Sequence, residues 1–283
     1  MEARGDFFYP LAWRGTRAHP GRHASRLQGG TEEFAGLEPF VRNPRARQID
    51  IRASLADPLG QWRVRSYRQR SSIAVEVMAD FSASMNWVGR YDKRETLSRL
   101  VATMAWSAYR EGDWFGFQAA NEGLIEELTL PARLYKGGVP EFCTKLLHYP
   151  RSGQGHQGFL QAAAQLGRAR RLVFLISDFH WAEAAITEVL AALVRHDVVP
   201  VVLWDPAESE IESDYGLVVV ADPETGQKRR LFLRPALRKM ILEHFEARRQ
   251  TLTRLLGSVG RPPLYVNGGF VADDLTAYFL STL

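Results

Sequence analysis

Two short and uninterrupted apolar segments constrain the fold of this chain more than any other feature of its sequence. Leu172 to Ile176 reads LVFLI, and Val198 to Trp204 reads VVPVVLW. A strand that is apolar at consecutive positions must be buried on both faces, as central strands of parallel sheets are when helices cover them. Segments with helical spacing separate these strands, so the sequence predicts a doubly wound, mostly parallel α/β sheet over residues 73–283.

Further strands and helices are expected within the same residues. Ile73 to Ala79 (IAVEVMA) is expected to form a β-strand, and Lys93 to Arg110 to form a helix, because its apolar residues recur at helical spacing. Two strands, Asp113 to Ala119 and Leu124 to Leu130, are expected next in the chain. Pro131 is expected to open one helical turn.

Residues 1–72 differ from the rest in charge and pattern, and we predict that they form a separate Arg-rich region. They contain 13 arginines and no lysine against 7 acidic residues. Residues 1–30 show no period and are expected to form an extended arm, whereas residues 31–72 have the alternating runs of a small β-rich lead-in. The arginines are scattered among aromatic and aliphatic residues, so we expect them to pair with carboxylates and pack on rings, and do not expect nucleic-acid binding.

The sequence favours a cytoplasmic location. No window holds 18 uninterrupted apolar residues, so no membrane span is expected. The first ten residues, MEARGDFFYP, lack the basic and then apolar pattern of a secretory signal. A single cysteine, Cys143, excludes an internal disulfide and fits a reducing compartment.

Three expected strands end in a carboxylate, namely Asp80, Asp178 and Asp205. Only the first continues into closely spaced hydroxyls, Ser82 and Ser84. A carboxylate and two hydroxyls on alternate residues of a tight loop can converge on one point, and such hard oxygens suit Mg²⁺, Mn²⁺ or Ca²⁺. We therefore predict a metal site of Asp80, Ser82 and Ser84, with Asp178 contacting the ion across the crevice. The alternative is that the serines cap the next helix and Asp80 accepts backbone N–H groups.

The run Asp-Phe-Ser-Ala-Ser-Met at residues 80–85, followed by Leu-Ile-Ser-Asp at 175–178, resembles the metal-ion-dependent adhesion site of von Willebrand factor A domains. The preceding region resembles the signature of a bacterial family of unknown function, whose members are usually encoded beside MoxR-type AAA+ ATPases. The similarity runs over roughly residues 20–205. The residues that match this signature are Gly21, His23, Ser25, Glu33, Phe34, Arg47, Ile49, Asp50, Val64 and Arg65.

The chain departs from the family pattern at three places. Asn43-Pro44 stands where the family has Gly-Asp, and Ile51 where it has Trp. The loop Gly153 to Gly158 lacks the threonine that such metal sites take from a Gly-Gly-Thr loop. Gln157 aligns best with that threonine, and its amide oxygen is the expected replacement ligand. Because this threonine is missing, we expect the metal site to be weakened or degenerate.

The resemblance implies a binding module and not an enzyme. The ion keeps one coordination position open, and an Asp or Glu of a client protein fills it. The implied partner is a MoxR-type AAA+ ATPase, with this chain as adaptor in the maturation or assembly of other proteins, of which methanol dehydrogenase is one setting.

Two other functions stay open. One is a metal-dependent hydrolase or phosphotransferase that uses Asp80, and the other is a scaffold with a degenerate metal site. The sequence contains neither Gly-x-Ser-x-Gly nor the P-loop pattern GxxxxGK[ST], which argues against a serine hydrolase elbow and against this chain being the ATPase itself.

Overall fold

The computed structural model describes residues 5–13, 23–24, 32–42, 44, 46–209, 215–221, 228–258, 260–268 and 272–282. Its contacts divide the chain into two units. We call residues 11–73 the small unit, and residues 1–10 together with 74–283 the α/β unit. The first ten residues therefore group with the α/β unit, although the sequence had placed them in the N-terminal region.

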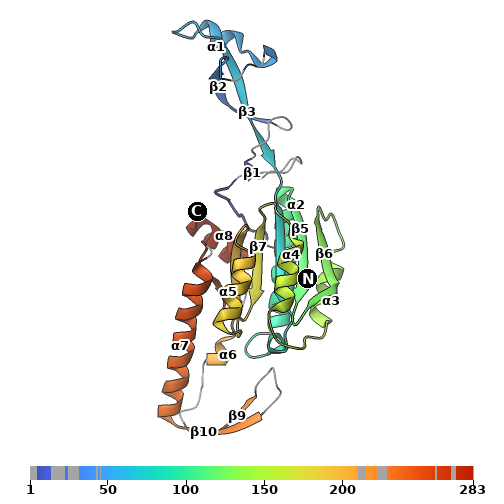
Figure 1. Ribbon diagram of the computed structural model, residues 1–283, viewed down its shortest axis with the longest axis vertical. Coiled ribbons are helices and arrows are strands. Elements are labelled where there is room, and N and C mark those ends of the chain that lie inside the picture. Colours follow the sequence, from blue (N-terminus) through green and yellow to red (C-terminus); the bar gives the residue numbers. More distant parts are fainter. Residues whose placement is uncertain are drawn as a thin grey trace. The chain divides into compact units, whose positions relative to one another are not determined.

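The α/β unit is built on a six-stranded sheet with the order β11-β8-β7-β4-β5-β6 (Figure 1). Every neighbouring pair is parallel except β5 and β6, which are antiparallel. The strands β4, β7 and β8 are buried at every position, as the uninterrupted apolar runs in β7 and β8 predict. The predicted mostly parallel α/β fold is thus confirmed. The strands are β4 (Ala74–Asp80), β5 (Trp114–Ala120), β6 (Leu124–Arg133), β7 (Leu172–Ser177), β8 (Asp197–Leu203) and β11 (Leu264–Val266).

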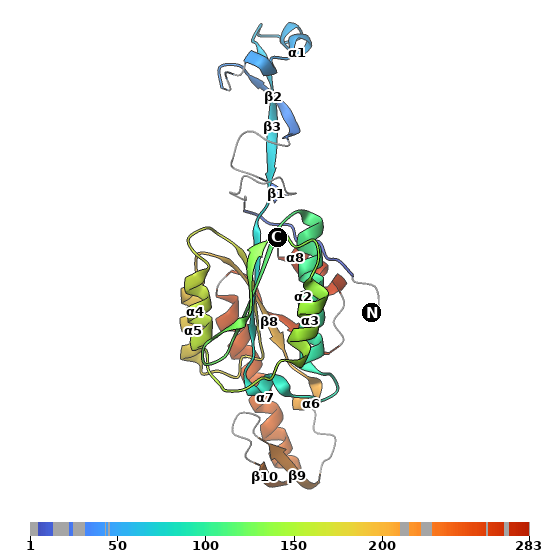
Figure 2. The same cartoon turned by 90° about the vertical axis from the view of Figure 1, so that its right-hand side faces the viewer.

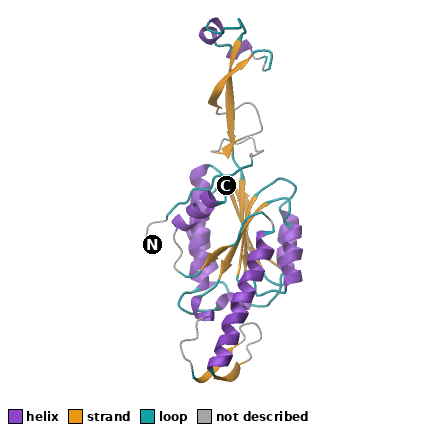
Figure 3. Cartoon of the chain, turned by 90° about the vertical axis from the view of Figure 1, so that its left-hand side faces the viewer, coloured by secondary structure: helices purple, strands orange, loops and turns teal. Residues whose placement is uncertain are grey.

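Helices cover both faces of this sheet (Figures 2 and 3). One face carries α4 and α5, with α7 packed beside α5, and the other carries α2, α3 and α8. Two short helical segments, η2 and α6, follow β4 and β8. The helical segments are η2 (Ala83–Asn86), α2 (Lys93–Glu111), α3 (Val139–His148), α4 (Gln157–Gln165), α5 (Glu183–Ala192), α6 (Pro206–Ser209), α7 (Pro235–Gly257) and α8 (Ala272–Ser281).

Successive residues of β7 face opposite layers of helices. Val173 and Leu175 belong to the apolar cluster formed with α4, α5 and α7. Phe174 points the other way, with its ring centroid 6.1 Å from that of Phe7 and 6.1 Å from that of Phe279 in α8. This alternation places apolar packing on both sides of the strand that leads to Asp178.

The expected helical turn at Pro131 is wrong, because β6 continues through this residue to Arg133. Strand β6 lies at the edge of the sheet and pairs only with β5. Proline lacks a backbone N–H, which is tolerated in an edge strand because one side of the strand needs no partner. A separate antiparallel hairpin, β9 (Gly216–Ala221) and β10 (Lys228–Leu233), precedes α7.

The small unit is a narrow antiparallel sheet with the order β1-β3-β2. Asp50 caps its helix α1 by accepting a hydrogen bond from the Ala53 N–H at 3.0 Å, and it also pairs with Arg65 of β3 at 2.9 Å. The expected arm over residues 1–30 lies largely outside the described residues. Gly21 and Ser25 of the family signature also lie outside them, as does Asn43, where the chain departs from the family pattern. The elements are β1 (His23–Ala24), β2 (Glu32–Pro39), η1 (Ala46–Gln48), α1 (Ile51–Leu55) and β3 (Arg63–Ser71).

Across the described part of both units, none of the helices combines the length and the apolar character needed to cross a membrane.

Candidate metal centre

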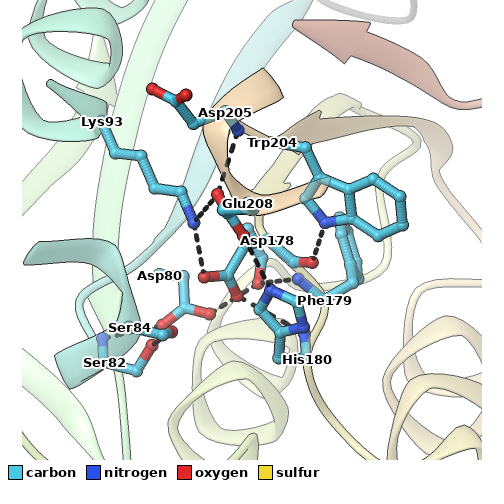
Figure 4. A network of polar contacts seen from close by, with 11 residues as sticks. Asp80, Ser82, Ser84, Lys93, Asp178, Phe179, His180, Trp204, Asp205 and Glu208 are labelled. Atoms are coloured by element: carbon cyan, nitrogen blue, oxygen red, sulfur yellow. Dashed lines mark hydrogen bonds and ion pairs between the residues drawn. The ribbon is translucent and has the colours of Figure 1, made fainter. Parts of the chain in front are cut away.

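Four of the five predicted ligands gather at one edge of the sheet (Figure 4). Asp80 is the last residue of β4, and Asp178 directly follows β7, its parallel neighbour in the sheet. The carboxyl ends of parallel neighbours meet at the same edge, which is where doubly wound sheets bind ligands. Ser82 and Ser84 follow Asp80 in the loop and in η2. All four side chains are at most 3% exposed.

Both carboxylate oxygens of Asp80 accept hydrogen bonds. The Ser82 N–H donates to Oδ1 at 2.8 Å, and the Ser177 hydroxyl donates to Oδ2 at 2.6 Å. Asp80 therefore accepts one backbone N–H, which is part of the alternative in which Asp80 only binds backbone and the serines cap a helix. Its second partner, Ser177, was not anticipated from the sequence, although it directly precedes Asp178.

The two serines do not act as helix caps. Ser82 occupies the position before η2, yet its side chain makes no capping hydrogen bond. Its hydroxyl lies 3.1 Å from the Ser84 hydroxyl instead. Two hydroxyl oxygens facing each other beside a carboxylate form the kind of oxygen cluster that a hard cation requires.

The surroundings of Asp80 and Asp178 shift the pKa values of the two carboxyl groups in opposite directions. Burial and the negative charge of Asp178 raise the pKa of Asp80 to about 7. Burial also acts to raise the pKa of Asp178, but the charges of Lys93 and His180 and a hydrogen bond from Ser84 outweigh it and lower this pKa. The surroundings thus favour the charged form of Asp178 more than that of Asp80.

Lys93 supplies a buried positive charge at this edge, and no sequence motif predicts a role for it in the metal site. Its ammonium lies 3.0 Å from Asp178 Oδ2 and 2.9 Å from Glu208 Oε1, and its side chain is only 4% exposed (Figure 4). Burial acts to lower the pKa of Lys93, but the two carboxylates together raise it. One signal was present in the sequence: Lys93 opens a helix, where a cation opposes the helix dipole.

Glu208 joins this network from α6. Its Oε1 accepts a hydrogen bond from the Asp205 N–H at 3.0 Å, and its Oε2 lies 3.3 Å from His180 Nε2. Asp205 accepts the Ala207 N–H at 2.7 Å, so Asp205 and Glu208 form a reciprocal cap at the start of α6. Asp205, the third strand-end carboxylate, also accepts the Tyr91 N–H at 2.7 Å, and it therefore anchors backbone.

Gln157, the fifth predicted ligand, makes its described hydrogen bond outside the hydroxyl cluster. It is exposed at the start of α4, and its hydrogen-bond partner is His156 at 3.4 Å. Among the described residues, no hydrogen bond joins Gln157 to Asp80, Ser82 or Ser84. The preceding loop does reach the site through its backbone, because the Ala83 N–H donates to the Gly153 carbonyl at 3.0 Å.

The loop after Asp178 is held in place from a distant helix. Phe179 has a positive φ of 52°, an unusual conformation for a bulky residue. Arg248 of α7 donates to the carbonyl oxygens of Phe179 at 2.7 Å and Trp181 at 2.5 Å. The Trp204 indole N–H donates to the Asp178 carbonyl at 2.8 Å. A cleft of about 450 Å³ opens beside this loop, with Trp204 and Glu208 in its wall.

The donor set fits a hard divalent cation and not a soft one. Within the described ranges, no group of three or more His, Cys, Asp or Glu side chains is placed to hold a metal. An ion at this edge would therefore depend on the hydroxyls of Ser82 and Ser84 as well as on Asp80 and Asp178. Carboxylate and hydroxyl oxygens are donors of the type that Mg²⁺, Mn²⁺ and Ca²⁺ prefer.

The fold and this edge together define a doubly wound α/β protein with a buried, oxygen-lined site at the carboxyl ends of β4 and β7. Residues 45–251 match a family described as "Protein of unknown function DUF58". The match covers more than half of the chain, and the chain therefore belongs to this family. The family expected from the sequence signature is confirmed.

Known relatives cover parts of the chain. The uncharacterized protein Rv1480 of Mycobacterium tuberculosis is 26% identical over 193 residues, which are 66% of this chain and 60% of the relative. The chain thus spans about 60% of the length of this relative. An "uncharacterized protein in moxR 3'region" of Paracoccus denitrificans is 32% identical over 104 residues, covering 37% of this chain and 99% of that protein.

Among solved structures, BatB from Bacteroides thetaiotaomicron resembles the chain with a TM-score of 0.44 and 15% identity. The likeness covers 74% of this chain and 98% of BatB.

Proposed function

We propose that this chain is a metal-dependent protein-binding adaptor that works with a MoxR-type AAA+ ATPase in the maturation or assembly of other proteins. The observation that carries the metal site is the convergence of Asp80, Ser82, Ser84 and Asp178 in one buried cluster. The Paracoccus relative named for the moxR 3' region supports the choice of ATPase.

In this proposal Asp80, Ser82, Ser84 and Asp178 hold a Mg²⁺, Mn²⁺ or Ca²⁺ ion, and Gln157 stays a predicted fifth ligand. The ion supplies a positive charge that an Asp or Glu of a bound protein, the ATPase or the client, can neutralise. The chain's own residues orient the donors: Ser177 and the Ser82 N–H fix the two oxygens of Asp80. The single cysteine favours a cytoplasmic place of action.

We favour a binding role over catalysis for Asp80. A carboxylate that anchors an ion needs oxygens held in fixed positions, and an oxygen that accepts one hydrogen bond keeps a lone pair for the ion. Both oxygens of Asp80 are engaged by donors at 2.8 and 2.6 Å, and these contacts suit a fixed anchor. The proposal therefore assigns no catalytic residue.

The test is binding of the purified chain to the AAA+ ATPase encoded beside its own gene, with Mg²⁺ and then with EDTA. We expect Ser82→Ala and removal of the ion each to weaken binding by about tenfold or more. Ser281→Ala, at an exposed serine of α8, is the matched control and should bind as the wild type does. Unchanged binding in EDTA and in Ser82→Ala would sink the metal-dependent adaptor and leave a scaffold.

A further inference from the structure

The strongest unexplained feature of the candidate metal centre is that it already contains a cation. The Lys93 ammonium is buried between Asp178 and Glu208, at 3.0 and 2.9 Å from their oxygens. Burying an ammonium is costly unless carboxylates compensate it. Its position at the start of α2 adds the repulsion of the helix dipole. The two carboxylates are therefore the reason that this side chain is stable where it lies.

The charges within the centre are distributed unevenly. Asp178 and Glu208 face Lys93, and His180 lies 3.3 Å from Glu208. On this side one ammonium is shared between two carboxylates. Asp80, in contrast, is held by the Ser177 hydroxyl and the Ser82 N–H, which carry no net charge. Ser84 lies between the two halves, since its hydroxyl faces Ser82 and its side chain also bonds to Asp178.

A divalent ion drawn to this cluster meets the Lys93 ammonium, because Asp178 already faces that cation through Oδ2 at 3.0 Å. Asp178 contributes its charge either to Lys93 or to the ion, and two cations that share one buried carboxylate repel each other. The low polarity of a site whose side chains are almost fully buried strengthens this repulsion relative to water.

We propose that Lys93 is an internal competitor for the metal ion: its ammonium and a divalent cation compete for Asp178, so that Lys93 sets the metal affinity of the centre. This inference rests on the proposed metal-binding function and adds the residue that controls its metal affinity. An ammonium displaced from Asp178 by the ion would still have Glu208 as a partner, because Glu208 Oε1 lies 2.9 Å from Lys93 in the structure. Metal binding is thereby linked to α6, which carries Glu208.

The test compares Mn²⁺ binding to the full chain, measured by electron paramagnetic resonance, in the wild type and in Lys93→Met. Methionine keeps the unbranched stem and removes the charge. We expect the dissociation constant of Lys93→Met to fall by about tenfold or more. Lys93→Arg keeps the charge and is expected to bind Mn²⁺ as weakly as the wild type. Lys239→Met removes the charge of an exposed lysine of α7 and should change nothing.

A second variant covers the case in which Lys93→Met fails to fold. Lys93→Met combined with Glu208→Gln removes one charge of each sign and leaves no unpaired buried carboxylate at Glu208. Tighter Mn²⁺ binding in the folded variant supports the competition. Binding equal to the wild type or weaker overturns it, while the metal centre itself stands. If neither the wild type nor any Lys93 variant binds Mn²⁺, the metal centre and the proposed function fail together.

Discussion

The α/β unit has an extensive buried apolar core, whereas the small unit exposes many of its large apolar side chains. Strands β4, β7 and β8 are buried at every position. In the small unit, Ile51 and Leu55 of α1 are 66% and 83% exposed, and Trp62 is 60% exposed. Among the described residues 46–66, Val64 is the one apolar residue that is fully buried.

The difference shows that each unit is stabilised internally by a different kind of interaction. Burial of apolar surface stabilises the α/β unit, at about 25 cal/mol per Å². The small unit relies on directional contacts instead: the Asp50 cap of α1, the Asp50–Arg65 pair, and an ion pair between Arg63 and Asp57. In each of the two ion pairs the arginine is partly exposed, and pairs near solvent contribute little each. Equivalent mutations should therefore cost far more in the α/β unit.

The largest effect is expected for Phe174→Ala. This ring packs against Phe7 and Phe279, and its removal leaves a cavity between the sheet and α8. We expect a loss of about 3–5 kcal/mol in the free energy of unfolding, measured by urea denaturation. Phe8→Ala, at a ring that is 53% exposed, is the control and should stay within about 0.5 kcal/mol. A loss below about 1.5 kcal/mol for Phe174→Ala would contradict the packing on this face.

The next effect concerns ion pairs. Arg261 and Asp197 are each 9% exposed and lie 2.7 Å apart in the α/β unit. Arg261→Met leaves Asp197 buried without this partner, and we expect it to cost about 3 kcal/mol. The same change at Arg65, which is 54% exposed, should cost at most about 1 kcal/mol. Equal losses at the two sites would remove the distinction between the units.

A smaller effect is expected at the cap of α1. Asp50→Ala removes the hydrogen bond to the Ala53 N–H and the contact with Arg65, and should lower stability by about 1 kcal/mol. Asp50→Asn keeps a capping oxygen while it removes the charge, so it should retain most of that stability. Hydrogen exchange of the α1 amides measures both changes locally. Protection lost equally in both variants would show that the ion pair, and not the cap, holds the helix.

The smallest effect is expected for Leu55→Ser, because this side chain is 83% exposed. Its unfolding free energy should stay within about 0.5 kcal/mol of the wild type. Leu175→Ser, in the buried strand β7, gives the opposite reference and should destabilise the chain strongly. A loss above about 1 kcal/mol for Leu55→Ser would mean that Leu55 is covered in solution.

The sequence was sufficient for the central strands and for most of the candidate site. Strands such as β7 are apolar without interruption, and this pattern leaves few alternatives. Asp80, Ser82 and Ser84 are close in sequence, so a single loop determines their proximity. Asp178 could be added because parallel neighbouring strands end at the same edge of a sheet.

Contacts between distant residues were beyond the sequence pattern. Lys93, Asp178 and Glu208 come from three segments, and 85 positions separate Lys93 from Asp178. Which lysine reaches which carboxylate depends on the strand order and on helix positions, and neither follows from local spacing. The helical turn expected at Pro131 failed for a related reason, since only the position of β6 at the sheet edge makes proline acceptable there.

The aromatic cluster of Phe7, Phe174 and Phe279 also has a consequence for the order of folding during synthesis. Its rings lie 6.0–6.1 Å apart but belong to residues made at widely separated times. Strand β7 can form before residue 279 has left the ribosome, and until then one face of Phe174 has no α8 to cover it. Such contacts of high sequence separation slow folding and expose apolar surface to aggregation. We therefore expect the nascent α/β unit to expose apolar surface on this face of the sheet until α8 docks.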